Sequence, residues 1–152
     1  SGTKLLTKLF NSGRYEALLE LTEELLLEFP NSLFIHNLLG ETYAKLGEDI
    51  KAIKHYDISV DLMSKNPTNN SYKHYMPNIH NNLGVALKAI GFLDRAEFNL
   101  KKAIEYDPTS SSVYNNYGNL QSDRANLKSA QECFLKAIDL DPTNFKAYWN
   151  LH

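Results

Sequence analysis

Residues 78–91, NIHNNLGVALKAIG, and residues 112–125, SVYNNYGNLQSDRA, carry the same pattern 34 residues apart. Each segment contains an asparagine doublet, then one apolar or aromatic residue, then a glycine. Self-similarity at a fixed spacing of this size is the sequence signature of a repeat architecture. The doublets therefore indicate a chain built from repeated units, and they raise the question of what two adjacent asparagines do in each unit.

Other landmarks keep the same spacing. Gly40 and Ala52 are 12 residues apart, as are Gly84 and Ala96. Gly40 and Gly84 are 44 residues apart, so ten extra residues interrupt the pattern around Pro67. The pairs that repeat at a spacing of 34 are Gly84 and Gly118, Ala96 and Ala130, Ala103 and Ala137, and Pro108 and Pro142.

The periodicity inside each unit is helical. Leu39, Tyr43 and Leu46 form an i, i+4, i+7 stripe, which is typical of one face of an α-helix. Asp-Pro at 107–108 and 141–142 ends the second helix of a unit, because proline disfavours a helical conformation in the preceding residue. Each unit is therefore predicted to be a helix, a short turn, a second helix and a loop. We expect the glycines to face the alanines, so that the two helices approach closely.

The period, the glycine and alanine landmarks, the aromatic residues Tyr56 and Phe134 and the closing prolines resemble the tetratricopeptide repeat. This resemblance covers nearly the whole chain and implies an all-α fold, a right-handed superhelical solenoid of antiparallel helix pairs. The expected parts are a degenerate repeat at 3–32, repeats at 33–66, 77–110 and 111–144, an insertion loop at 67–76, and the first helix of a truncated repeat at 145–152.

The resemblance also implies a function, the binding of a protein or an extended peptide in a concave groove. In the family, the residue two before the glycine points into this groove, and Asn82, Asn116 and Asn150 take that place. The pattern is similar to the asparagine ladder of the O-linked N-acetylglucosamine transferase repeats. A carboxamide can pair with both the N–H and the C=O of a peptide backbone. The candidate groove residues are Asn37, Glu41, Asn78, Asn81, Asn82, Asn115, Asn116, Asn119, Lys146 and Asn150.

Two readings of the asparagines stay open. They contact a peptide, or they reflect a residue that is common at this place in tetratricopeptide repeats whatever these bind. Leu38 stands there in the earlier unit, which weakens the ladder in the first half of the groove. The first asparagine of each doublet is expected to be a solvated groove residue. A clamp for a C-terminal carboxylate is not expected, because Lys146 has no second cation at the required spacing.

Composition excludes several classes of function. Net charge is −2 with no basic run, so neither nucleic acid nor a membrane is an expected partner. The single cysteine, Cys133, excludes an intramolecular disulfide, and we expect a cytoplasmic setting. No catalytic constellation or cofactor motif is present, so the chain is not expected to be an enzyme. His36 and His80 stand where the family packs an aromatic ring, which favours packing over metal binding.

Two alternatives to a simple binding module remain. The chain could be the substrate-recruiting arm of a transferase or oxygenase whose catalytic domain lies elsewhere. It could also self-associate through residues 145–152, which place Phe145, Tyr148, Trp149 and Leu151 in one short helix. In the insertion, Tyr72, Tyr75 and Met76 are expected to cover the gap left by the longer linker, with contact to a ligand as the alternative.

Overall fold

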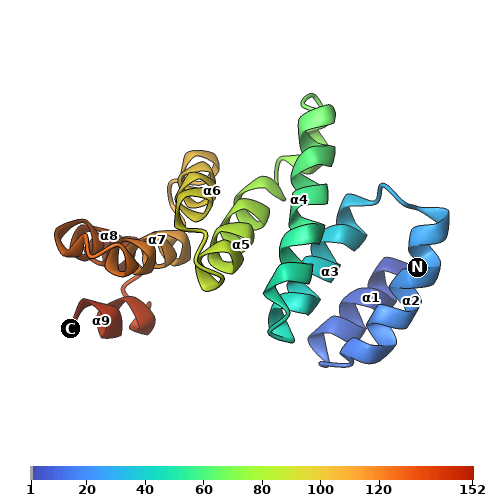
Figure 1. The fold of residues 1–152 in the computed structure, drawn as a ribbon, viewed down its shortest axis with the longest axis horizontal. Helices are drawn as coiled ribbons and strands as arrows, with labels where there is room; N and C mark the ends of the chain where they lie inside the picture. Colours follow the sequence, from blue (N-terminus) through green and yellow to red (C-terminus); the bar gives the residue numbers. More distant parts are fainter. Residues whose placement is uncertain (1) are drawn as a thin grey trace. The chain divides into compact units, whose positions relative to one another are not determined.

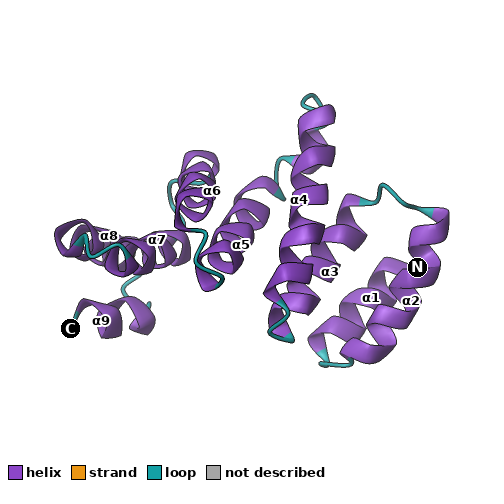
Figure 2. Cartoon of the chain, viewed as in Figure 1, coloured by secondary structure: helices purple, strands orange, loops and turns teal. Residues whose placement is uncertain are grey.

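The computed structural model describes residues 2–152, and the described residues form helices joined by short turns, without a β-strand (Figures 1 and 2). The all-α prediction is thereby confirmed. The helices are α1 (Gly2–Asn11), α2 (Tyr15–Glu28), α3 (Leu33–Lys45), α4 (Asp49–Lys65), α5 (Met76–Ala89), α6 (Leu93–Tyr106), α7 (Ser111–Asp123), α8 (Leu127–Leu140) and α9 (Phe145–Leu151). One 3-10 turn, η1 (Asn70–Tyr72), lies before α5.

The chain forms two compact units, the first ending at Pro67 and the second beginning at Thr68. The border lies at the start of the ten-residue interruption of the sequence pattern. Within that insertion Asn69 caps η1 by accepting the N–H of Ser71. Tyr72, Tyr75 and Met76 are half-buried, and α5 begins at Met76, one residue before Pro77.

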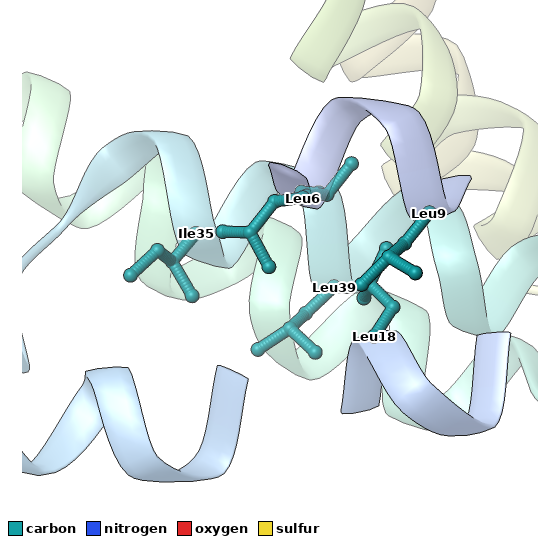
Figure 3. Close-up of a cluster of buried hydrophobic side chains, with 6 residues drawn as sticks. Leu6, Leu9, Leu18, Ile35 and Leu39 are labelled. Carbon is teal, nitrogen blue, oxygen red and sulfur yellow. The ribbon is translucent and has the colours of Figure 1, made fainter. Parts of the chain in front are cut away.

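The first unit is held together by leucine and isoleucine side chains from its first three helices (Figure 3). Leu6 and Leu9 of α1 and Leu18 of α2 pack with residues of α3, and Leu18 is fully buried. The α3 residues of the cluster are Ile35, Leu38 and Leu39. Leu6 takes the place that Gly40 holds in the next repeat, so the degenerate first repeat fills with a side chain what the other repeats leave open. Helix α4 packs on α3.

The second unit is a stack of hairpins. Helix α5 pairs with α6, and α7 pairs with α8, while α6 also packs on α7. The first helices of successive repeats touch, since α5 contacts α7 and α7 contacts α9. Helix α9 docks on α7 and α8 through Ala147, which is fully buried. This stacking places the residues of α7 and α9 side by side, which determines the candidate site.

The glycines do not face the alanines as expected. A Cβ on Gly118 would lie 2.5 Å from the ring of Phe134, and one on Gly40 would lie 2.4 Å from the ring of Tyr56. For Gly84, the nearest atom is Cγ of Leu100 at 2.7 Å. In each hairpin the large residue lies four positions after the alanine, one turn further along the second helix. The glycine therefore makes room for a buried side chain, and the alanine is buried separately.

The turn between the two helices of each hairpin uses a left-handed residue. Gly13, Gly47 and Gly91 have φ of 72°, 75° and 86°, and Ala125 has φ of 62° at the equivalent place. After Ala125 the N–H of Asn126 bonds the carbonyl of Gln121, which is the Schellman pattern of helix ends. Only a residue without Cβ adopts this backbone freely. The last hairpin thus carries strain that the others avoid.

We expect Ala125→Gly to raise the free energy of unfolding by about 0.5–1 kcal/mol, since the left-handed conformation costs an L-residue about 1–2 kcal/mol and glycine gives part of this back as chain entropy. Thermal unfolding followed by circular dichroism measures the change. Ala89→Gly, at an exposed position at the end of helix α5, is the control and should be destabilising. A lower melting temperature for Ala125→Gly would contradict the assignment of strain.

Candidate functional site

The asparagine doublets form hydrogen bonds between successive repeats. Asn116 of α7 donates its Nδ2 to Oδ1 of Asn81 on α5, at 3.0 Å. Asn150 of α9 donates in the same way to Oδ1 of Asn115 on α7, also at 3.0 Å. In both cases the second asparagine of one doublet donates to the first asparagine of the preceding doublet. The doublet therefore joins neighbouring first helices.

The first asparagine of each doublet is thus more than a solvated groove residue. Asn115 is 5% exposed and Asn81 is half-buried, and each uses its side-chain oxygen as an acceptor. A buried carboxamide oxygen without a partner would cost about 1–3 kcal/mol, so these bonds hold the helix stack in register. The second asparagines spend one N–H on this bond and keep the other N–H and the oxygen.

A hollow of about 570 Å³ lies between α7 and α9, and we call it the α7–α9 groove. Its lining includes three asparagines of α7 together with Lys146 and Asn150 of α9, all predicted from the sequence. The complete lining is Asn115, Asn116, Asn119, Phe145, Lys146, Trp149 and Asn150. Asn119 is half-buried, and the structure records no side-chain hydrogen bond for it among residues 2–152, so its donors and acceptor are available to a ligand.

Two aromatic residues of this groove were not predicted as site residues. Trp149 is 85% exposed and Phe145 is 78% exposed, on the same helix as Lys146. The sequence analysis assigned them to packing or self-association. Their spacing could have indicated the groove, because residues four apart lie on one helix face and Trp149 is adjacent to Asn150. The groove therefore combines carboxamides, one cation and two large rings.

The remaining predicted residues lie outside this hollow. Asn78 is exposed on α5, and Asn82 is half-buried on the same helix without a recorded side-chain hydrogen bond among residues 2–152. Asn37 and Glu41 belong to α3 of the first unit, where Asn37 Nδ2 donates to Glu41 Oε1 at 3.1 Å. Burial raises the pKa of Glu41, while this bond and Lys45 act in the opposite direction. Oδ1 of Asn37 is buried without a partner in the described chain.

The two histidines at the aromatic position are buried and take part in hydrogen bonds. His80 Nδ1 donates to Asn99 Oδ1 at 2.9 Å, and Asn99 Nδ2 donates to the carbonyl of Arg95. His36 Nε2 donates to the carbonyl of Pro30 at 2.8 Å, and its Nδ1 lies 3.1 Å from Nδ1 of His55. Among the described residues no group of three metal-ligating side chains is present. These contacts are those of packing residues, as the sequence indicated.

The polar network beside the groove is structural. Tyr117 donates its hydroxyl to Glu97 Oε1 at 3.0 Å, and Gln121 donates to the same oxygen at 3.3 Å. Burial, followed by the bond to Glu97, raises the pKa of Tyr117 to about 12. Arg124 closes the network by pairing with Glu97 and Asp94. These bonds connect α6 to α7 and thereby support the helix that carries Asn115, Asn116 and Asn119. Separately, none of the helices in residues 2–152 has the length and apolar character needed to cross a membrane.

Comparison with solved structures shows the fold. The chain is 22% identical to MamA over 95% of its own length and 78% of that protein, with a TM-score of 0.81. The crystal structure of the APC/C hetero-tetramer Cut9–Hcn1 contains a match at 17% identity and a TM-score of 0.90, covering 98% of this chain and 28% of the other. The first tetratricopeptide repeat domain of Spaghetti, bound to the HSP90 peptide SRMEEVD, matches at 22% identity and a TM-score of 0.65, covering 78% of this chain and 86% of the other.

Comparison with sequence families gives the same answer independently of coordinates. Two models, both described as tetratricopeptide repeat, match residues 77–110 and 99–132. Among curated proteins no significant sequence match is found. The first of the two family matches covers the hairpin of α5 and α6, and the second joins α6 to α7. With the helical hairpins, the glycine landmarks and the matching solved structures, these findings show that the chain is a tetratricopeptide repeat protein.

Proposed function

We propose that the chain is a protein-binding scaffold without catalysis of its own, and that the α7–α9 groove holds an extended peptide segment. The observation that carries this proposal is the composition of the groove. Phe145 and Trp149 expose large rings beside unspent carboxamide groups of Asn116 and Asn119. Exposed aromatic side chains of this size are costly in water and are the residue types that dominate binding energies at protein interfaces.

Each group in the groove has a distinct part in the proposed complex. The carboxamides pair with backbone N–H and C=O groups of the peptide, which gives affinity with little dependence on sequence. The rings of Phe145 and Trp149 contact apolar side chains of the peptide, which sets its preference. Lys146, exposed at the edge, favours an acidic residue nearby. The peptide complex of Spaghetti supports this use of the fold, although at 22% identity the likeness concerns the fold alone.

A selected peptide tests the proposal. A random peptide library displayed on phage is panned against the immobilised chain, and the enriched peptide is labelled and titrated by fluorescence anisotropy. We expect Trp149→Ala to weaken its binding by about thirtyfold, as for a central aromatic at an interface. Asn119→Ala, which removes a carboxamide without an internal partner, should weaken it by about twofold to tenfold.

Two matched controls accompany these variants. Gln131→Ala removes an exposed carboxamide from α8, and Phe98→Ala removes an aromatic ring that is 60% exposed on α6. Neither residue lines the groove. Both controls should leave the affinity unchanged. Enrichment of no peptide, or equal losses in groove and control variants, would overturn the assignment of the groove.

Self-association is the second candidate, because the same exposed rings could receive another copy of the chain. Sedimentation of the same variants distinguishes the two. If a dimer forms and Trp149→Ala dissociates it, with no peptide enriched, the groove is an interface between copies. Recruitment of substrates for an enzyme domain elsewhere in a longer chain is a further proposal, and it would use the peptide groove in the same way. A cytoplasmic setting likewise stays a prediction.

A further inference from the structure

A second hollow, of about 690 Å³, lies on the first unit and is lined almost entirely by one helix. We call it the α1 hollow. Its lining is Thr3, Lys4, Thr7, Lys8, Asn11, Ser12 and Phe34. Two ammonium groups, hydroxyl and amide side chains and one ring converge there, and no carboxylate is part of the lining. None of these residues was a candidate in the sequence analysis, and none belongs to the α7–α9 groove.

We propose that the α1 hollow binds an acidic peptide segment through Lys4 and Lys8, with an apolar side chain of the segment against Phe34. This site is separate from the α7–α9 groove and does not rest on the function proposed there. The ligand chemistry is set by side-chain carboxylates, so an internal segment rich in glutamate or aspartate is recognised as well as a terminal one.

The charges of the hollow are unbalanced inside the described chain. Lysines elsewhere, such as Lys51, Lys65 and Lys101, pair with carboxylates three or four residues away on their own helices. Neither Lys4 nor Lys8 has an ion pair among residues 2–152. The hollow thus presents two cations whose counterions must come from outside the described structure.

The spacing of the two lysines adds a second argument. Residues four apart lie on the same helix face, and two like charges there destabilise a helix by a few tenths of a kcal/mol. Lys8 lies in the last turn of α1, where the helix dipole compensates for its charge, but Lys4 has no such compensation. A carboxylate held between the two ammonium groups removes the repulsion and gains two charge-assisted hydrogen bonds.

The other residues of the hollow complete the recognition. Thr7 Oγ1 donates to the carbonyl of Thr3, and Ser12 Oγ donates to the carbonyl of Leu9, so both hydroxyl oxygens keep acceptor capacity for backbone N–H groups. Phe34 packs against the buried core cluster of the first unit, which fixes the position of its ring. A peptide with carboxylates next to an apolar side chain therefore meets complementary chemistry at each wall.

The test uses a fluorescein-labelled peptide, GEELEEFEEG, with an amidated C-terminus, titrated with the full chain by fluorescence anisotropy. Binding is expected to weaken strongly as the salt concentration rises, because exposed charge pairs are screened. The double substitution Lys4→Gln and Lys8→Gln is expected to weaken it by about fivefold or more, from the loss of two exposed pairs. The glutamine analogue GQQLQQFQQG should not bind measurably.

The control removes the same charge elsewhere. Lys128→Gln with Lys136→Gln changes two exposed lysines of α8 that have no recorded ion pair among residues 2–152, and it should leave the affinity within about twofold of the starting chain. Trp149→Ala should also leave it unchanged, which separates this site from the α7–α9 groove. Equal losses in both lysine pairs would mean general attraction and would overturn the proposal. Binding only by the peptide with a free C-terminal carboxylate would overturn it as well.

Discussion

Gly118→Val is expected to lower the free energy of unfolding by about 3 kcal/mol, at the upper end of what overpacking costs in a protein core. The Cβ alone would lie 2.5 Å from the ring of Phe134, which is 3% exposed and has no space to retreat. The helices α7 and α8 must therefore separate or the ring must leave its rotamer. Urea denaturation followed by circular dichroism measures the loss.

A mutant cycle identifies the cause. Phe134→Ala alone is destabilising, but in its background Gly118→Val should cost at least about 1.5 kcal/mol less, because the ring it collides with is gone. Ser122→Val places the same side chain at an exposed position of α7 and should cost less than about 0.5 kcal/mol. A Gly118→Val penalty that is independent of Phe134 would contradict the close approach described here.

Acidification is expected to destabilise the first unit through His55. Burial, followed by the charges of His36 and Lys54, lowers the pKa of His55 to about 4 from 6.5. The unfolded chain therefore binds a proton at this site before the folded chain does, and stability present above about pH 6.5 is lost as the pH falls toward 4. A pKa unit corresponds to about 1.4 kcal/mol, and with allowance for the partly exposed ring the loss is about 2 kcal/mol.

The hydrogen bonds explain why this position is sensitive. His36 Nε2 donates to the Pro30 carbonyl, so neutral His36 accepts at Nδ1 and His55 must donate there. A ring already stacked between His36 and Tyr43 gains a positive charge with no carboxylate partner recorded for it. Protonation thus places a charge in a crowded, apolar setting.

The matched variant for this prediction is His55→Asn, because Asn99 occupies the equivalent position opposite His80. Urea denaturation between about pH 7.5 and about pH 4.5 should show a steeper decline for the starting chain than for the variant, by about 2 kcal/mol over the range. The pKa of His80 is also lowered, mainly by burial, and its contribution is common to both proteins. Parallel declines would rule out His55 as the acid-sensitive group.

The repeat pattern made the fold predictable, because a period of 34 residues with fixed glycines leaves few architectures open. The contacts inside each hairpin were less accessible. Nothing in the spacing of Gly118 and Ala130 tells which residue of the second helix reaches the glycine, since that depends on the crossing angle of two helices. The sequence therefore predicted that small residues mattered, and wrongly predicted what they face.

The candidate site was predicted in part for a similar reason. Asn116, Asn119 and Lys146 share a groove because first helices stack, which the repeat implied. The bond from Asn116 to Asn81 links residues 35 positions apart, one more than the period, and so joins different positions of successive repeats. A comparison that aligns like with like does not reveal such an offset pair. Phe145 and Trp149 were missed because exposed rings on a helix look the same as rings awaiting a neighbouring helix.

The head-to-tail bonds between asparagine doublets bear on how arrays of this kind change length. Each doublet carries one donor directed toward the preceding repeat and one acceptor open to the following repeat, as Asn116 and Asn115 show. A duplicated or deleted hairpin that keeps the doublet leaves every donor opposite an acceptor at the new junction. Gene rearrangements by whole repeats are therefore tolerated by this connector, whereas a shift by a single helix places the doublet against a surface that cannot answer it.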